Sequence, residues 1–462
     1  MPATRRPAQR WSQRLPVVGC LVLLTLGSAV AGYAQKRPCL QNSWENSFQY
    51  THHCYSDIYP LYQAEKLNIG AVPYVDHPVE YPVLIGGTMH LAASAARSFP
   101  TAERPVAYYN ITALILGACL LLVLASTALL AGPRRWDVVL VAVSPVVIVY
   151  SFYNWDLLAM AFAGLGLEAW RRRRPEVAGV LLGLGAASKL YPAFLLVALL
   201  PLCFRADRLR AWAVAAGSGA AAWTAVNLPI YLAAPDGWLR FYQLSKERGP
   251  EIDTVWYQIS YLTAGWREGA GKAVHEVVAP PQPGEAPALL NLLTLLGLAA
   301  LWLLIYFIVL RAPVRPRVPQ VAYLIVVSFL LVNKVWSPQF SIWYVPLVVL
   351  ALPRRILFAW LQTAELLVFV GVLGYLASWN DRAIGVTAGT FFSAVWLRNG
   401  ILLLISAIIV RDMYRPANDV VRRDGVDDPA GGVLDGAPEG PLSQRFLPGF
   451  LQPRPLAPPD SV

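Results

Sequence analysis

The chain alternates long apolar runs with short polar connections. Each run covers about 15 to 27 residues, the length expected of straight or broken helices that cross a bilayer. The runs lie at residues 15–34, 106–131, 137–152, 154–170, 175–189, 190–204, 209–233, 287–310, 317–333, 336–352, 354–377 and 395–411. This pattern predicts an all-α polytopic membrane protein with about 12 transmembrane helices.

The polar connections predict how the chain is threaded. If every run crosses, all the Arg-rich connections fall on the side where the chain begins. They are GPRRW, RRRRP, RADRLR, RAPVRPR and PRR, with the exit RDMYR. Because cytoplasmic loops carry an excess of Lys and Arg, that side is predicted to be the cytoplasm. Both termini are then cytoplasmic, and external loops, with helices of their own, cover residues 35–105, 234–286 and 378–394.

One further apolar stretch does not fit this threading as a span. Residues 82–98 read PVLIGGTMHLAASAARS, and counting them as a crossing would place every later Arg cluster outside. We therefore expect a helix that lies in, or re-enters, the external interface. The alternative is a full span with the topology corrected elsewhere.

The composition agrees with a membrane protein. The 462 residues are 56% hydrophobic and 14% charged, against about 45–50% apolar and about 25% charged in soluble domains. The formal charge of +10 follows from the Arg clusters in the loops, so no nucleic-acid partner is expected.

The two ends of the chain differ in character. Residues 1–34 resemble a signal peptide, but we expect an uncleaved first span that starts in the cytoplasm. Residues 415–462 are rich in Pro, Gly and mixed charge and are predicted to form a disordered cytoplasmic tail. The membrane domain is then residues 1–414.

The cysteines suggest one disulfide. Cys20, Cys119 and Cys203 fall within apolar runs and are expected to be packing residues. Cys39 and Cys54 follow the first span on its external side, where an oxidising compartment allows them to pair. Two unpaired thiols are the alternative.

Ionisable side chains gather on the predicted external side, although such groups are costly in a membrane, about 2.5–3.5 kcal/mol at a helix centre. They are Asp57, Asp76, Glu80, Asp156, Lys189, Arg248, Asp253 and Lys334. Solvated loop charge is the alternative; it is weakest for Asp156 and Lys189, whose turns are too short to reach far into water.

Asp57 is the principal candidate for chemistry. It stands among aromatic residues in CYSDIYPLY, where a carboxylate is suited to accept a proton as a general base. Lys and Arg side chains on the same side could hold an anionic leaving group such as a phosphate. Together these groups predict external group transfer from a lipid-carried donor. The alternative is that Asp57 caps a helix starting near Ile58.

Other motifs carry less weight. GLGAAS at residues 183–188 imitates a dinucleotide fingerprint, but it lies within an apolar run, so close packing of small residues explains it better. His52 and His53 with Asp57 could be metal ligands, although adjacent His side chains seldom converge on one ion.

Several motifs follow one another in a specific order within residues 15–411. They are CYSDIYPLY, VPYVDHPVEYPVLIG, YNWDLLA, GLGAASKLYPAFLL and NKVWSPQFSIWYVPL. Together they resemble the actinobacterial membrane transferases of glycosyltransferase family 87, which include polyprenol-phosphate-mannose-dependent α-1,2-mannosyltransferases. The resemblance implies a GT-C fold, an active site at the external face of the plasma membrane, a polyprenyl-phosphate sugar donor and an inverting displacement. The implied acceptor is a lipid-linked or cell-envelope glycan.

The resemblance also implies roles for individual residues, with Asp57 as the catalytic base. The implied contacts of the donor phosphate or lipid are Lys189, Tyr191, Lys334, Gln339 and Arg248. The residues implied to line the cavity around the acceptor are Glu80, Tyr81, Asn154, Asp156 and Trp256. The Cys pair and the His pair of the first loop depart from the family pattern, which leaves the sugar and the acceptor open.

Other functions remain in view. Relatives of the same fold transfer arabinofuranose instead of mannose. A lipid-glycan flippase or small-solute carrier is the rival class, but a carrier should place its ionisable groups near the midplane. A catalytically inactive scaffold is the third alternative. The chemistry requires no metal, and a divalent cation, Mg²⁺ or Mn²⁺, is left open.

Overall fold

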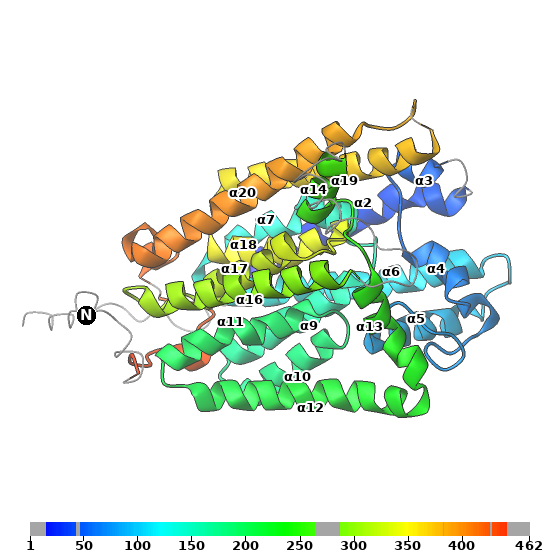
Figure 1. Ribbon diagram of the computed structural model, residues 1–462. Coiled ribbons are helices and arrows are strands. Elements are labelled where there is room, and N and C mark those ends of the chain that lie inside the picture. The colour runs from blue at the N-terminus through cyan, green and yellow to red at the C-terminus, as the bar shows by residue number, and fades with distance from the viewer. Residues whose placement is uncertain (1–14, 43–46, 265–286, 382, 426, 441–462) are drawn as a thin grey trace, which may run out of the picture.

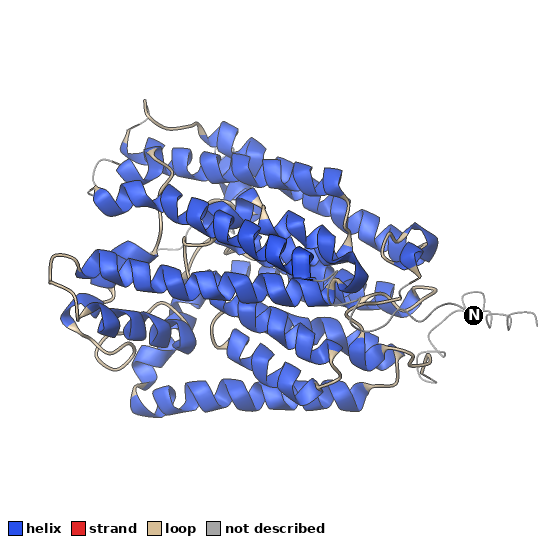
Figure 2. Cartoon of the chain, turned by 180° about the vertical axis from the view of Figure 1, so that it is seen from behind, coloured by secondary structure: helices blue, strands red, loops and turns tan. Residues whose placement is uncertain are grey.

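Helices make up the regular structure of the computed structural model, which describes residues 15–42, 47–264, 287–381, 383–425 and 427–440. Figure 2 shows helices joined by loops, with no strand in these residues. The predicted all-α fold is therefore confirmed for the described part of the chain.

Some helices are long enough to cross a bilayer. Five within the described residues combine sufficient length and hydropathy. They are α2 (Leu15–Gln41), α6 (Arg104–Leu130), α16 (Ala288–Arg311), α19 (Arg355–Asn380) and α20 (Ala388–Tyr414). A further long helix is α12 (Leu209–Ala233). The five agree with a multi-pass membrane protein, while the total of about 12 crossings stays a prediction.

The other predicted runs form shorter or broken helices. The single short helices are α9 (Asp156–Arg171), α10 (Pro175–Ala186), α11 (Tyr191–Arg205) and α17 (Val318–Val332). Run 137–152 is divided among η2 (Gly132–Val138), α7 (Val139–Ala142) and α8 (Pro145–Tyr150), and run 336–352 between η3 (Pro338–Tyr344) and α18 (Val345–Ala351). The break before α8 has a local cause, because the Ser144 hydroxyl accepts the Val147 N–H and Pro145 follows as the first helical residue.

Small residues bring α10 and α12 close together. A Cβ atom at Gly183 would lie 2.1 Å from the Gly219 carbonyl oxygen, and one at Gly179 would lie 2.0 Å from that of Ala215. Only glycine permits this approach. The glycines of GLGAAS therefore serve helix packing, as predicted.

The predicted external loops contain helices of their own. They are α3 (Phe48–Thr51), α4 (Ile58–Ala64), η1 (Leu67–Ile69), α5 (Val83–Ala96), α13 (Pro235–Glu247) and α14 (Val255–Ala264). In Figure 1, α3, α4 and α5 lie at the right-hand end of the long helices. The 14 residues of α5 span about 21 Å, less than the hydrocarbon core of about 30 Å. This length fits the predicted interfacial helix better than a crossing.

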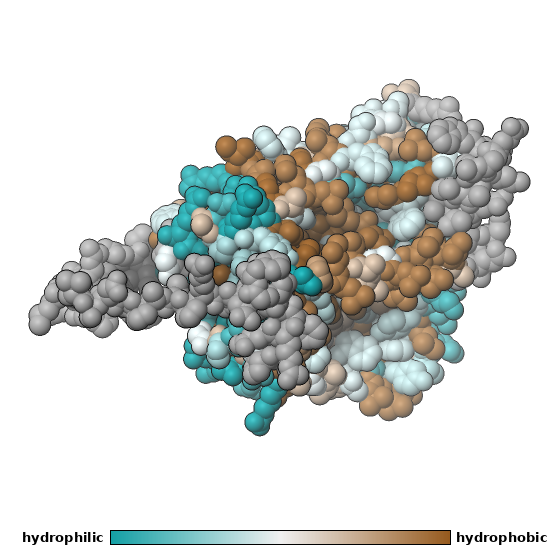
Figure 3. Space-filling view, turned by 60° about the vertical axis from the view of Figure 1, so that its left-hand side comes forward, coloured by the Kyte–Doolittle hydropathy of each residue, from teal (hydrophilic) through white to brown (hydrophobic). Residues whose placement is uncertain are grey.

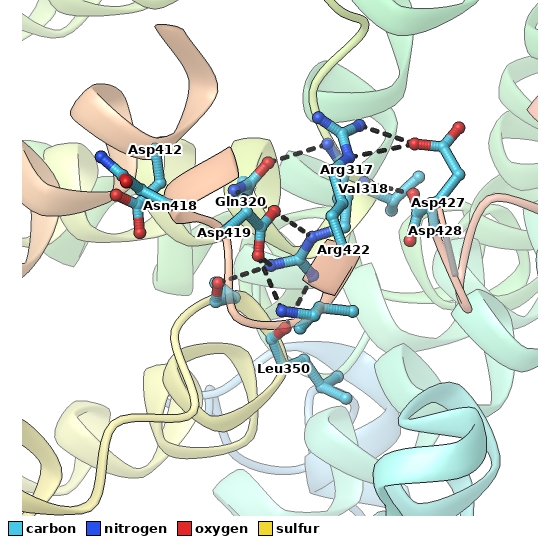
Figure 4. A network of polar contacts seen from close by, with 12 residues as sticks. Arg317, Val318, Gln320, Leu350, Asp412, Asn418, Asp419, Arg422, Asp427 and Asp428 are labelled. Atoms are coloured by element: carbon cyan, nitrogen blue, oxygen red, sulfur yellow. Dashed lines mark hydrogen bonds and ion pairs between the residues drawn. The ribbon is translucent and has the colours of Figure 1, made fainter. Parts of the chain in front are cut away.

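The C-terminal segment differs from its prediction. Residues 415–440 were predicted to be disordered, but they contain η4 (Pro416–Asn418), η5 (Arg422–Asp424) and η6 (Gly432–Leu434) and pack on the opposite end of the bundle, left in Figure 1. The Arg317 guanidinium donates to both carboxylate oxygens of Asp419, at 2.8 and 3.1 Å (Figure 4). Arg205 binds Glu439 in the same two-bond manner.

The prediction of disorder was wrong for these residues because it weighed only their low apolar content. Buried charge pairs with paired hydrogen bonds hold the segment instead. Residues 441–462 lie outside the described residues.

The basic connections meet at this same end. The tail contacts Gly132, Trp170, Arg205, Arg317 and Arg354. In Figure 3, apolar side chains fill the middle of the visible face, and hydrophilic ones gather toward its left. The Arg-rich connections that predicted one side of the membrane thus do share one end of the molecule.

Candidate active site

Asp57 lies directly before α4, with both carboxylate oxygens engaged. The Tyr55 hydroxyl donates to Oδ1 at 2.7 Å, and Asn154 Nδ2 donates to Oδ2 at 2.6 Å. The Asp57 N–H donates to the Tyr153 carbonyl at 2.8 Å. Although Asp57 occupies the N-cap position of α4, its side chain makes no capping hydrogen bond. Its side chain is therefore directed to the Tyr55–Asn154 site rather than to the helix.

The surroundings of Asp57 favour uptake of a proton. Burial raises the pKa of Asp57 above its usual value, against the opposing effects of Tyr55, Asn154 and the Lys189 charge. The charge of Asp57 in turn raises the pKa of Tyr55, so this phenol stays a donor. A carboxylate with a raised pKa is better matched to a general base near neutral pH.

Asn154 joins Asp57 to Tyr81. Its Nδ2 also donates to the Tyr81 hydroxyl at 3.0 Å, while its Oδ1 accepts the Trp155 N–H at 2.6 Å. The second bond fixes which way the amide faces. Burial raises the pKa of Tyr81 well above the ordinary phenol value, so this hydroxyl is neutral.

Lys189 and Asp156 form the next part of the site. Lys189 Nζ lies 3.6 Å from Asp156 Oδ2, and the Trp343 indole N–H donates to Asp156 Oδ1 at 2.8 Å. The ammonium also lies 5.2 Å from the ring centroid of Tyr81 and 5.2 Å from that of Phe340. These contacts hold a cation between two aromatic faces.

Tyr191 reaches this group indirectly. Its ring stacks on Trp343 with centroids 4.6 Å apart. Tyr191 therefore supports the indole that binds Asp156.

Arg248 organises a neighbouring cluster of charges. It forms ion pairs with Glu80 and, at 3.0 Å, with Glu251. Lys334 Nζ donates to the Arg248 carbonyl at 2.5 Å. Burial and the Arg248 charge lower the pKa of Lys334 to about 8. Glu80 and Tyr81 are consecutive residues, so this cluster adjoins the Asp57 group.

The last two predicted residues are placed less directly. Gln339 is buried in η3 beside Phe340, and within the described chain its Oε1 has no hydrogen-bond partner. The Trp256 indole donates to the Val332 carbonyl at 2.7 Å, which ties α14 to the end of α17. Among the described residues, no hydrogen bond or ring stacking joins Trp256 to the Asp57 group.

The sequence analysis missed several contributors. Tyr55, Phe340 and Trp343 stand inside the quoted motifs CYSDIYPLY and NKVWSPQFSIWYVPL, so proximity in sequence was the available signal. Nothing in the sequence indicated the buried ion pair between Arg398 and Asp253, which lie 3.6 Å apart. The reason is that α20 and the second predicted external loop are far apart in the chain.

Cys39 and Cys54 form a disulfide with an S–S distance of 2.08 Å. Cys39 lies near the end of α2, and Cys54 lies three residues before Asp57. The bond thus ties the start of the candidate site to the first long helix.

The site offers few protein ligands for a divalent metal ion. No three His, Cys, Asp or Glu side chains converge as ligands within the part of the chain that the structure describes. The Asp57 carboxylate is engaged by phenol and amide donors, whereas Asp156 Oδ2, 3.6 Å from the Lys189 ammonium, accepts no hydrogen bond among the described residues. No step of the proposed chemistry is assigned to a metal ion.

The long apolar helices and the connected group of Asp57, Asn154 and Lys189 are those of a multi-pass membrane protein with a polar site. The family model for glycosyltransferase family 87 matches residues 90–332, more than half of the 462-residue chain. The chain belongs to glycosyltransferase family 87 and is a membrane glycosyltransferase. No curated protein matches it.

The match covers part of the site. Asn154, Asp156, Lys189, Tyr191, Arg248 and Trp256 lie within it. Asp57, Glu80 and Tyr81 precede it, and Lys334 and Gln339 follow it. The structure is what brings Asp57 and Tyr81 to Asn154.

Proposed function

We propose that this glycosyltransferase moves mannose, with inversion, from a polyprenyl-phosphate donor to a lipid-linked or cell-envelope glycan at the external face of the plasma membrane. The observation that carries the proposal is the Asp57 carboxylate, held by Tyr55 and Asn154 beside the Lys189 ammonium. A base and a cation in one group are what displacement of an anionic leaving group requires.

Asp57 acts as the base in the proposed reaction. It takes the proton of an acceptor hydroxyl while that oxygen forms a bond to the anomeric carbon of the donor sugar. The bond from the anomeric carbon to the phosphate oxygen breaks, and its electron pair leaves with the polyprenyl phosphate. Attack from the face opposite the phosphate converts a β-linked donor into an α-linked product.

The donor phosphate is assigned to the cations of the site. Lys189 is the first candidate because its ammonium lies between the faces of Tyr81 and Phe340 in the same connected group as Asp57. Arg248 and Lys334 form the second candidate group. Tyr191 and Gln339 are assigned to contacts with the donor phosphate or its lipid. Glu80, Tyr81, Asn154, Asp156 and Trp256 are assigned to the cavity around the acceptor.

A donor comparison tests the proposal. The full-length protein in lipid nanodiscs would receive labelled polyprenyl-phosphate mannose, or the corresponding arabinofuranose donor, with a phosphatidylinositol mannoside acceptor. Transfer from the mannose donor alone, to an α-linked product, is expected. Transfer from the arabinose donor alone would replace the sugar in the proposal. Movement of intact lipid between leaflets without a transferred sugar would favour a flippase.

A further inference from the structure

The external end of α2 binds three consecutive residues that shortly precede Asp57, namely residues 53–55. Gln35 Nε2 donates to the His53 carbonyl, Cys39 is bonded to Cys54, and Lys36 Nζ donates to the Tyr55 carbonyl at 2.8 Å. Positions 35, 36 and 39 lie on one helix face, since residues three and four apart are neighbours. We call these contacts the α2 clamp.

The contact made by Lys36 requires the burial of a charged side chain. Its side chain is 1% exposed, and burying an ammonium costs free energy unless its charge is compensated. The compensation comes from the Tyr55 carbonyl, from the faces of Tyr153 and Phe369, whose ring centroids lie 5.0 and 5.8 Å from Nζ, and from the charge of Asp57. An apolar side chain could fill the same space without this cost.

The opposite side of the same segment rests on the turn that carries Asn154. The Ser56 hydroxyl donates to the Phe152 carbonyl at 2.8 Å, and the Asp57 N–H donates to the Tyr153 carbonyl. The Tyr55 ring packs on that of Tyr153 with centroids 5.1 Å apart. Residues 53–57 are thus held between α2 and the turn before α9.

This placement joins Lys36 to Asp57 through one residue. Lys36 fixes the backbone of Tyr55, whose hydroxyl then donates to Asp57 Oδ1 at 2.7 Å. The turn that supports Tyr55 also positions Asn154, the second partner of Asp57. A shift of Tyr55 would therefore move one of the two bonds that orient the carboxylate.

We propose that Lys36 is a positioning residue for Asp57, acting through Tyr55, and that the Cys39–Cys54 disulfide holds the α2 clamp closed. The inference rests on the proposed role of Asp57 as the base. A misplacement of about 1 Å at a reacting group can cost about a hundredfold in rate, so loss of the clamp lowers kcat more than it raises KM for the donor.

The test compares variants in nanodiscs with polyprenyl-phosphate mannose as the donor. Lys36→Met keeps the length of the side chain without its donors, Lys36→Arg keeps a buried cation, and Arg37→Met removes the exposed cation next in the same helix. We expect Lys36→Met to lower kcat about 10- to 100-fold with KM changed less than about twofold. Lys36→Arg should recover much of the loss, and Arg37→Met should match the parent.

A separate set of variants tests the disulfide. Replacing Cys39 and Cys54 by Ser should lower kcat in the same direction, while Cys119→Ser, in a buried apolar position, should not. Unchanged kcat in the double variant would remove the disulfide from the clamp.

The outcomes separate this inference from the proposed function. A parent protein without transfer activity contradicts the function. An active parent whose Lys36→Met variant keeps its kcat, or whose Lys36→Arg variant is no better than Lys36→Met, contradicts the clamp alone. If Lys36→Met does not fold, Tyr55→Phe decides, because it deletes only the hydroxyl that binds Asp57, and an unchanged kcat there overturns the inference.

Discussion

Replacing Asp57 by Asn tests the chemistry with little change in shape. Asn keeps an oxygen that can accept the Tyr55 hydroxyl, but it cannot take up the proton of an acceptor hydroxyl. Its amide nitrogen would face Asn154 Nδ2, which now donates to Asp57 at 2.6 Å. Asn154 cannot rotate to adapt without losing the bond from the Trp155 N–H to its Oδ1.

The structure therefore sets two separate magnitudes. The lost hydrogen bond to a charged acceptor should lower the free energy of unfolding by about 1.5–3 kcal/mol. The lost general base should lower the transfer rate by about a hundred- to ten-thousandfold, or roughly 3–5 kcal/mol of barrier. Transfer should be nearly abolished in protein that remains folded and binds the donor.

Asn154→Ala is the matched control. It deletes the same Asn154–Asp57 hydrogen bond but leaves the carboxylate, so its stability should fall by a similar amount while more activity remains than in Asp57→Asn. The assay is single-turnover transfer from labelled donor in nanodiscs, with thermal unfolding measured on the same samples.

A specific result would refute the assignment of the base. If folded Asp57→Asn transfers sugar at more than about a tenth of the parental rate, the barrier has risen by no more than about 1.4 kcal/mol. General-base catalysis by Asp57 would then be wrong, and Glu80 or Asp156 would become the next candidate.

Three further predictions concern topology, pH and the tail. A Cys at Ser245 should react with an impermeant thiol reagent from outside the cell and one at Glu176 should not; the reverse pattern would overturn the threading. The acid limb of kcat/KM should lie above the usual aspartate pKa of about 3.9, because the ionised base is required and its pKa is raised. Lys189→Met should move this limb to higher pH, since the lysine charge lowers that pKa; a shift to lower pH would contradict the electrostatic reasoning. Asp419→Asn should lower the free energy of unfolding by about 3–5 kcal/mol, because it leaves the buried Arg317 without its charged partner. The control Asp427→Asn, at a side chain that is 69% exposed, should lower it by at most about 1 kcal/mol. Equal melting temperatures of the two variants would show that the tail does not depend on its buried pair.

Much of the fold follows from hydropathy alone. The long apolar runs near 106–131, 287–310 and 354–377 correspond to α6, α16 and α19. The sequence did not indicate that α2 continues to Gln41, because Lys36 and Arg37 end the apolar run that a membrane helix requires. Tertiary contacts allow the helix to continue to Gln41, since the Lys36 ammonium packs on the Tyr153 ring and donates a hydrogen bond to the Tyr55 carbonyl.

The residues of the site could be predicted from the sequence only in part. Motif resemblance indicated Asp57, Tyr81, Asn154 and Lys189, which the structure brings into one connected group. It could not indicate Tyr55 as a hydrogen-bond donor, because the orientation of a side chain two residues away depends on the turn at Tyr153. Long-range pairs are likewise invisible to local patterns, and the tail shows this most clearly.

The charges of the site suggest how the donor phosphate is recognised. When all groups are ionised, Asp57 and Asp156 are balanced by Lys189 and Lys36, and Glu80 and Glu251 are balanced by Arg248 and Lys334. Net charge therefore gives an anionic donor no attraction, and direct contacts must supply it.

The separation between a cation and its paired acid indicates how readily that cation can turn to a phosphate. The Lys189–Asp156 separation is 3.6 Å, longer than the 3.0 Å between Arg248 and Glu251, so a phosphate competes more easily for Lys189 than for Arg248. Drawing this ammonium toward the phosphate would weaken the interaction that lowers the pKa of Asp57 and would make the carboxylate a stronger base as the donor binds. Lys189→Met should accordingly raise KM for the donor, and an unchanged KM would assign the phosphate to Arg248 and Lys334 instead.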